Sequence, residues 1–185
     1  MKHLYEALEE YSQSDYYPYH MPGHKRQMTD GFLPQAFQRD ITEIDGFDNL
    51  HDARGMIKEA EIRAARLYHS EETHFLVNGS TCGILAAVCA VTGKNDVLIM
   101  SRNCHKAAYH AALINELTAV WLYPKIFAEF DLCGGITPGQ VEEALTAHPE
   151  AKAVMITSPT YDGVVSDVKG IVETVHRYGH PLIVD

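Results

Sequence analysis

Short apolar runs recur along the second part of the chain, and polar residues follow each of them. None of the runs alternates strictly between apolar and polar positions, and each contains a β-branched residue. This pattern favours buried parallel strands over a half-exposed antiparallel sheet. The runs occupy residues 74–77, 97–100, 119–122, 153–156 and 181–184.

Segments with helical character lie between these runs. Thr137 stands before Pro138 and three residues before Gln140, an arrangement typical of a helix start. Asp167 can cap a later helix that Gly179 closes. Alternating strands and helices predict an α/β fold, namely a three-layer, mostly parallel, doubly wound sheet. The predicted helices cover residues 4–11, 55–69, a segment from about 80, about 103–117, a segment from 137, and 167–179.

The first 54 residues have a different character. A loop rich in Pro, Gly, His and Tyr at 16–25 precedes an acidic stretch at 40–52, and neither shows a clear period. We therefore predict an extended and partly helical arm at 1–54, followed by a domain at 55–185. The acidic stretch is either a solvated loop or a surface that attracts a cationic substrate.

Composition narrows the class of function. The net charge of −10 argues against non-specific binding to nucleic acid. No apolar run approaches the roughly 20 residues that cross a bilayer, and the first residues lack a signal-peptide core. The four cysteines form no Cys-x-x-Cys pair, which predicts reduced thiols. We expect a cytoplasmic protein with a small-molecule ligand, and no membrane or nucleic-acid partner.

Polar residues after the strands indicate where that ligand binds. In open α/β sheets, ligands lie beyond the carboxyl ends of the strands. Ser80 and Thr81 follow Asn78-Gly79 at a strand-to-helix turn, where free N–H groups and two hydroxyls suit a phosphate. The alternative is that Ser80 or Thr81 only caps the helix. The turn matches neither the nucleotide-binding glycine patterns nor the hydrolase Gly-x-Ser-x-Gly pattern.

Two further side chains have functional and structural interpretations. His105 follows the second run and is either a surface helix residue or a group that stacks on a flat ring or moves protons. Asp185 ends the last run, where a carboxylate needs a partner such as a cationic ring nitrogen, unless it caps a following helix. His20 and His24 are not expected to bind a metal, because Pro22-Gly23 prevents a helical i,i+4 pair.

Several stretches together carry a family resemblance. In order and spacing, the chain resembles the bacterial ornithine/lysine/arginine decarboxylases, which depend on pyridoxal 5'-phosphate (PLP) and have fold type I, the aspartate-aminotransferase fold. The resemblance covers nearly the whole chain and implies a cytoplasmic lyase of polyamine biosynthesis that forms a homodimer or higher homo-oligomer when full length. The matching stretches are 19–25, 40–46, 78–81, 102–106, 158–163 and 181–185.

The resemblance also implies roles for particular residues. Ser80 and Thr81 correspond to the phosphate-holding residues, His105 to the histidine on the pyridine ring, and Asp185 to the carboxylate that pairs with the ring nitrogen. Ser158 and Thr160 correspond to a loop that faces the cofactor. No metal is implied.

One part of the family pattern is not found in this sequence. The family's Schiff-base lysine and small C-terminal domain lie beyond Asp185, so we expect 1–185 to be an N-terminal fragment that is inactive alone. The whole protein would decarboxylate lysine, ornithine or arginine. The alternatives are a non-catalytic PLP-binding or interaction fragment, or part of another fold type I enzyme such as an aminotransferase or lyase.

Overall fold

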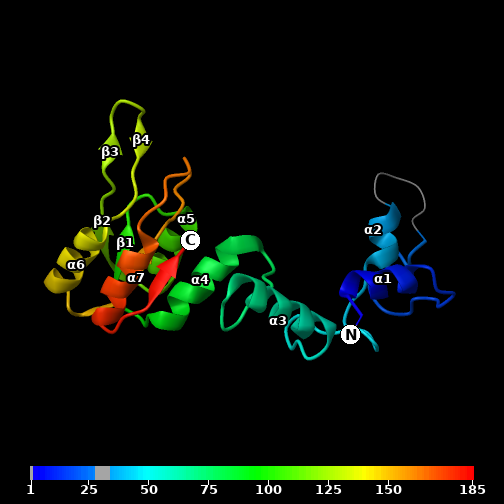
Figure 1. Ribbon diagram of the computed structural model, residues 1–185. Helices are drawn as coiled ribbons and strands as arrows, with labels where there is room; N and C mark the ends of the chain where they lie inside the picture. Colours follow the sequence, from blue (N-terminus) through cyan, green and yellow to red (C-terminus); the bar gives the residue numbers. More distant parts are fainter. Residues whose placement is uncertain (1, 28–33) are drawn as a thin grey trace. The chain divides into compact units, whose positions relative to one another are not determined.

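A computed structural model describes residues 2–27 and 34–185. The chain divides into two compact units, Met1–Phe75 and Leu76–Asp185, which are described separately below (Figure 1). The predicted arm, 1–54, lies within the first unit. None of the helices in the described ranges is long and apolar enough to cross a membrane.

The second unit is built on a four-stranded sheet. All three strand pairings are parallel, and the strand order is β2-β1-β5-β6. Four of the five predicted runs form these strands, because each presents apolar side chains that the layers above and below the sheet can bury. The strands are β1 (Val97–Ser101), β2 (Thr118–Leu122), β5 (Ala151–Ile156) and β6 (Leu182–Val184).

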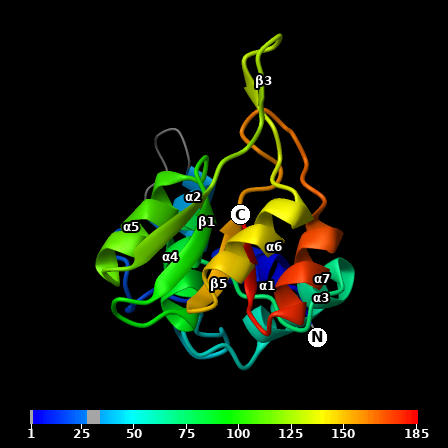
Figure 2. The ribbon, with the colours of Figure 1, turned by 90° about the vertical axis from the view of Figure 1, so that its left-hand side faces the viewer.

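Helices cover both faces of this sheet. Figure 2 shows α4 (Gly79–Val91) and α5 (Lys106–Ile114) on one side, and α6 (Pro138–Ala147) and α7 (Val168–Arg177) on the other. Successive β1 side chains point to opposite faces, so Leu98 and Met100 pack with α4 and α5 while Ile99 packs with α6 and α7. The predicted three-layer α/β architecture is therefore confirmed.

The starts of α6 and α7 follow the predicted caps. The Thr137 hydroxyl accepts from the Gln140 N–H at 3.3 Å, and Gln140 Oε1 accepts from the Thr137 N–H at 3.0 Å. Asp167 Oδ1 accepts from the Gly170 N–H at 3.0 Å. Gly179 follows α7 with a φ of 76°, a left-handed conformation that ends helices readily.

Two local predictions need correction, and one element of the second unit was not predicted. The run 74–77 forms no strand: Phe75, Leu76 and Val77 are each about half exposed, because the run spans the division between the two units and lacks a neighbouring strand in the described part of the chain. The helix predicted at 103–117 is shorter, since residues up to 105 form the turn before α5. An antiparallel hairpin of β3 (Ile126–Phe127) and β4 (Leu132–Cys133) extends away from the sheet and was not predicted (Figure 1).

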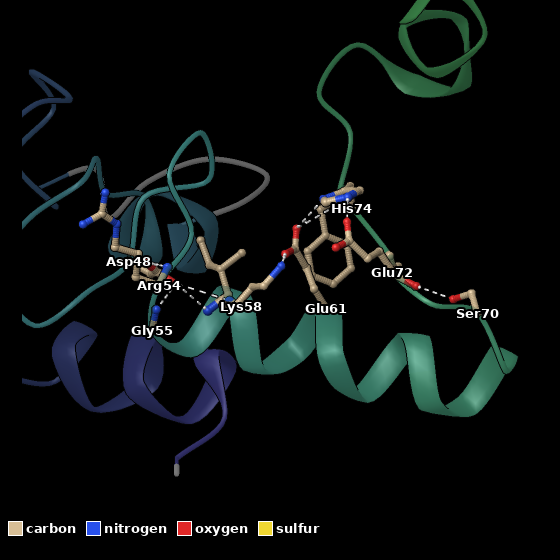
Figure 3. A network of polar contacts seen from close by, with 11 residues as sticks. Asp48, Arg54, Gly55, Lys58, Glu61, Ser70, Glu72 and His74 are labelled. Carbon is tan, nitrogen blue, oxygen red and sulfur yellow. Dashed lines mark hydrogen bonds and ion pairs between the residues drawn. The ribbon is translucent and has the colours of Figure 1, made fainter. Parts of the chain in front are cut away.

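The first unit contains α1 (Leu4–Ser12), α2 (Pro34–Arg39) and α3 (Met56–Tyr68). The predicted helices at 4–11 and 55–69 are confirmed, whereas α2 was not predicted. Polar contacts organise α3 (Figure 3). The Asp48 carboxylate accepts backbone N–H groups at the start of α3, at 2.8 Å from Gly55 and 3.0 Å from Ile57. It replaces a side-chain cap that Gly55, the residue before the helix, cannot supply.

Candidate active site

A cavity of about 380 Å³ lies at the carboxyl ends of β1, β5 and β6. Its volume falls in the range of small-molecule sites, roughly 300–1,000 Å³. It forms where the loops that leave these strands meet the first turn of α4. The cavity therefore occupies the part of an open α/β sheet where ligands bind. The lining residues are Ser80, Ile84, Asn103, Cys104, His105, Thr157, Pro159, Thr160, Tyr161 and Asp185.

Ser80 lies in the first turn of α4 and is exposed. Asn78 and Gly79 both have positive φ, 65° and 68°, and these left-handed residues turn the chain into the helix. Within the described part of the chain, Asn78 makes no side-chain capping hydrogen bond. The unpaired N–H groups of the first turn are therefore available to an anion beside Ser80. Thr81 is also exposed, but it does not line the cavity.

Asp185 enters the cavity because the sheet pairing continues past β6. Its N–H donates to the Ile156 carbonyl at 3.0 Å, and its carbonyl accepts from the Ser158 N–H at 2.9 Å. These two bonds hold the carboxylate next to the loop that follows β5. Asp185 and Ser80 thus line the same cavity from different elements.

His105 is the residue immediately before α5. Its Nδ1 atom accepts from the Ala107 N–H at 3.2 Å, so the imidazole caps the helix. An accepting Nδ1 leaves the proton of the neutral ring on Nε2. The ring is otherwise exposed and lines the cavity, while the neighbouring Lys106 is exposed and does not.

Ser158 and Thr160 shape the loop after β5. The Ser158 hydroxyl accepts from the Ser166 N–H at 3.0 Å, and the Thr160 hydroxyl accepts from the Val164 N–H at 3.1 Å. Thr160 is buried and lines the cavity, whereas Ser158 does not. Both hydroxyls therefore already have partners within their own loop.

Besides the exposed Tyr161, three polar lining residues were not predicted as site residues: Asn103, Cys104 and Thr157. Each lies within three residues of the end of β1 or β5, so their position just after a strand was an available signal. Ser101 links Cys104 and Thr157, because its hydroxyl lies 3.2 Å from Cys104 Sγ and accepts from the Thr157 N–H at 3.3 Å. Burial raises the pKa of the Cys104 thiol, which keeps it neutral beside the cavity.

The candidate groups of the first unit have local partners. His20 Nε2 lies 2.6 Å from the Tyr11 hydroxyl, and His24 Nε2 lies 3.3 Å from Asp40 Oδ2. Within the acidic stretch, Asp48 caps α3 as described above. These contacts account for His20, His24, Asp40 and Asp48 as structural residues.

Comparison with known proteins gives a consistent result. The family "Orn/Lys/Arg decarboxylase, major domain" matches residues 2–185. The chain is 37% identical over 189 residues to the uncharacterized protein YaaO of Bacillus subtilis, covering 98% of this chain and 39% of that protein. It is 34% identical over 190 residues to the arginine decarboxylase of B. subtilis, and the match covers 98% of this chain and 38% of that protein.

A solved structure shares the fold. The constitutive lysine decarboxylase of Escherichia coli superposes with a TM-score of 0.75 and 25% identity, covering 92% of this chain and 27% of that chain. The chain thus spans about two fifths of the length of the curated relatives that it matches.

Proposed function

Because this chain belongs to the Orn/Lys/Arg decarboxylase major-domain family, we propose that it forms the cofactor-binding part of a PLP-dependent decarboxylase of a basic amino acid. The whole protein would release CO2 and a diamine or polyamine precursor from lysine, ornithine or arginine. The relatives named as arginine and lysine decarboxylases support this substrate class.

One observation carries the proposal: Ser80, His105 and Asp185 line a single cavity, although 105 residues separate the first from the last. The cavity offers an anion-binding helix end, an aromatic ring and a carboxylate. A ligand with a phosphate, a flat ring and a basic ring nitrogen matches that set of groups. PLP has all three features.

Each of these residues would contact a different part of the cofactor. Ser80 and the N–H groups at the start of α4 would hold the phosphate, and Thr81 would support it from the same turn. His105 would lie against the ring, with its orientation fixed by the Ala107 N–H. Asp185 would keep a proton on the ring nitrogen by pairing with it. When bound, the cofactor supplies a ring that accepts electrons as CO2 leaves.

The loop after β5 gives the cavity its shape. The hydroxyls of Ser158 and Thr160 each accept a backbone N–H within that loop, and each keeps its own O–H as a donor. Thr160 lines the cavity and would face the cofactor, whereas Ser158 would act mainly through the conformation of the loop. Tyr161 is fully exposed at the rim. The proposal places the lysine that links to the cofactor outside residues 1–185, so this chain alone would bind PLP non-covalently and release no CO2.

Cofactor binding by the purified chain tests the proposal. We expect equilibrium dialysis to show that PLP binds, and a Ser80→Ala/Thr81→Ala variant to bind at least about tenfold more weakly, since it loses hydrogen bonds to a charged phosphate. Ser70→Ala/Thr73→Ala is a matched control, because these exposed hydroxyls contact each other in the first unit. Equal retention by the parent and the Ser80/Thr81 variant would exclude this phosphate site.

A second measurement addresses the linking lysine. We expect the chain alone to release no labelled CO2 from lysine, ornithine or arginine in the presence of PLP. Reduction with borohydride should leave no PLP attached to a lysine of the chain. Turnover by the purified chain would refute the placement of that lysine.

A further inference from the structure

Two buried polar atoms lie at the candidate site without an internal partner. Among residues 2–27 and 34–185, the buried side-chain oxygens that lack a hydrogen-bond partner are Asn103 Oδ1 and Thr157 Oγ1. Both residues line the cavity. Most buried polar atoms in proteins are hydrogen-bonded, so a pair of exceptions in one cavity needs an explanation.

Their positions in the fold are well defined. Asn103 is two residues beyond β1, and Thr157 directly follows β5, the strand that pairs with β1. The Ser101 side chain joins the two loops, because its hydroxyl accepts from the Thr157 N–H and lies 3.2 Å from Cys104 Sγ. Ser101 is itself fully buried. The two oxygens therefore belong to a fixed part of the cavity wall.

The hydroxyls of the loop after β5 differ in whether they accept a backbone N–H group. Ser158 and Thr160 each accept a backbone N–H and so hold the loop in shape. Thr157 donates its backbone N–H to the Ser101 hydroxyl, whereas its own hydroxyl forms no hydrogen bond of standard geometry within the described residues. The hydroxyl lies beside the Cys104 thiol and acts to lower the pKa of that thiol, but it accepts no backbone N–H and so does not hold the loop in shape.

We propose that Asn103 and Thr157 are further ligand-binding residues, which form hydrogen bonds to polar atoms of PLP in this cavity. The inference rests on the proposed function, because it takes PLP as the occupant. It adds two polar groups to the cavity that Ser80 and Asp185 also line. The protonated Cys104 thiol lines the same cavity and adds no charge to it.

The test uses near-isosteric apolar substitutions, Asn103→Leu and Thr157→Val, in the purified chain. We expect each to weaken PLP binding by about three- to tenfold in equilibrium dialysis, as for the loss of one hydrogen bond. The melting temperature without PLP should stay the same or rise, because each change removes a buried polar atom that has no internal partner. A purely structural role would lower it.

Matched variants complete the design. Thr157→Ser keeps the hydroxyl and should bind PLP as the parent does. Thr174→Val removes a buried hydroxyl that already donates to the Gly170 carbonyl at 2.9 Å, and it should leave PLP binding unchanged.

If Asn103→Leu and Thr157→Val bind PLP normally while Ser80→Ala/Thr81→Ala does not, the inference is wrong and the proposed site stands. If the parent chain binds no PLP, both this inference and the proposed PLP site are wrong. A fall in the ligand-free melting temperature, or failure to fold, also overturns the inference.

Discussion

The two units of this chain are stabilised in different ways. In the second unit, Leu98, Ile99 and Met100 of β1 are fully buried between two helical layers. In the described part of the first unit, the buried apolar residues are Pro18 and Ala65, while Leu67 and Tyr68 of α3 are about three-quarters exposed. The first unit relies more on polar contacts, such as those that Asp48 and Glu61 make with their neighbours (Figure 3).

This difference has a consequence for function. The candidate site lies entirely in the second unit, at the ends of strands that a buried core holds in register. Binding groups placed on rigid elements keep their geometry more accurately than groups on loosely packed segments. The contrast between the units can be tested by substitutions that remove one kind of interaction at a time.

The largest effect is expected from the apolar core of the second unit. Leu98→Ala should lower the free energy of unfolding by about 2–5 kcal/mol, because it leaves a cavity between the sheet and its helices. Leu8→Ala, at a partly exposed position of α1, should lower it by about 1 kcal/mol. Native-state hydrogen exchange, measured separately for peptides of each unit, checks both values. Equal losses at the two positions would remove the contrast.

The sheet and most of the helices could be predicted because their signals are local. Apolar runs separated by helical periods determine the strands β1, β2, β5 and β6, and cap residues determine where α6 and α7 begin. The strand predicted at 74–77 does not form, because an apolar run becomes a strand only beside a partner strand. The residues of the run carry no information about whether such a partner is present.

Several residues of the candidate site could also be predicted, because their positions relative to the strands are a local signal. The carboxyl ends of parallel strands meet at one edge, so Ser80, His105, Thr160 and Asp185 all line the cavity as their position after a strand or at a strand-to-helix turn suggests. What each side chain does there depends on contacts across loops. The Ser158 hydroxyl is taken by an N–H group eight residues later, and no sequence signal indicated that Asn103 Oδ1 or Thr157 Oγ1 would lack a partner within the described chain.

A second test concerns the polar contacts of the first unit. Desolvation acts to raise the pKa of Asp48, but backbone N–H groups of Arg54, Gly55, Asn49 and Lys58 outweigh it and lower the pKa to about 2, from an ordinary value of 3.8. The folded pKa is depressed, so the carboxylate contributes stability above about pH 4 that is lost as the pH falls toward 2. Asp48→Ala should lower the stability of α3 by about 1–2 kcal/mol near neutral pH.

Hydrogen exchange of the amides at 55–58, measured between about pH 5 and pH 2.5, checks this expectation. The parent should lose protection of α3 as the pH falls, and the Asp48→Ala variant should lose much less. Asp52→Ala is the control, because Asp52 is exposed and pairs only with the exposed Arg54 side chain in the described chain. If Asp48→Ala loses protection of α3 over the same pH range as the parent, Asp48 is not the group whose protonation destabilises the helix.

A third test compares ion pairs in the two units. Glu61 is buried, with Lys58 Nζ and the Phe75 N–H each at 3.4 Å and His74 Nδ1 at 3.8 Å. Glu116 is exposed and lies 2.8 Å from Lys94 Nζ. Lys58→Met should cost about 1 kcal/mol, because it removes a cation from a carboxylate that water reaches poorly, although partial exposure of Lys58 moderates the loss.

Lys94→Met should cost less than about 0.5 kcal/mol, as is usual for a surface pair. Denaturant unfolding of both variants gives the comparison. Adding Glu61→Gln to Lys58→Met should recover part of the loss, since the uncompensated charge is then gone. No recovery in the double variant would mean that Lys58 stabilises the first unit through its aliphatic stem instead.

The smallest effect is expected from a polar contact in the second unit. Thr137→Ala removes one accepting hydroxyl from the start of α6 and should lower the free energy of unfolding by about 0.5 kcal/mol, the lower end for an exposed cap. Asp48 accepts five backbone N–H groups, whereas Thr137 accepts one, and α6 is also held by the buried side chains of Val141 and Leu145. Thr137→Ser keeps the acceptor and should match the parent in thermal unfolding. A loss for Thr137→Ala as large as that for Asp48→Ala would mean that capping contacts matter equally in both units, and that the apolar core does not protect α6 from the loss of its cap.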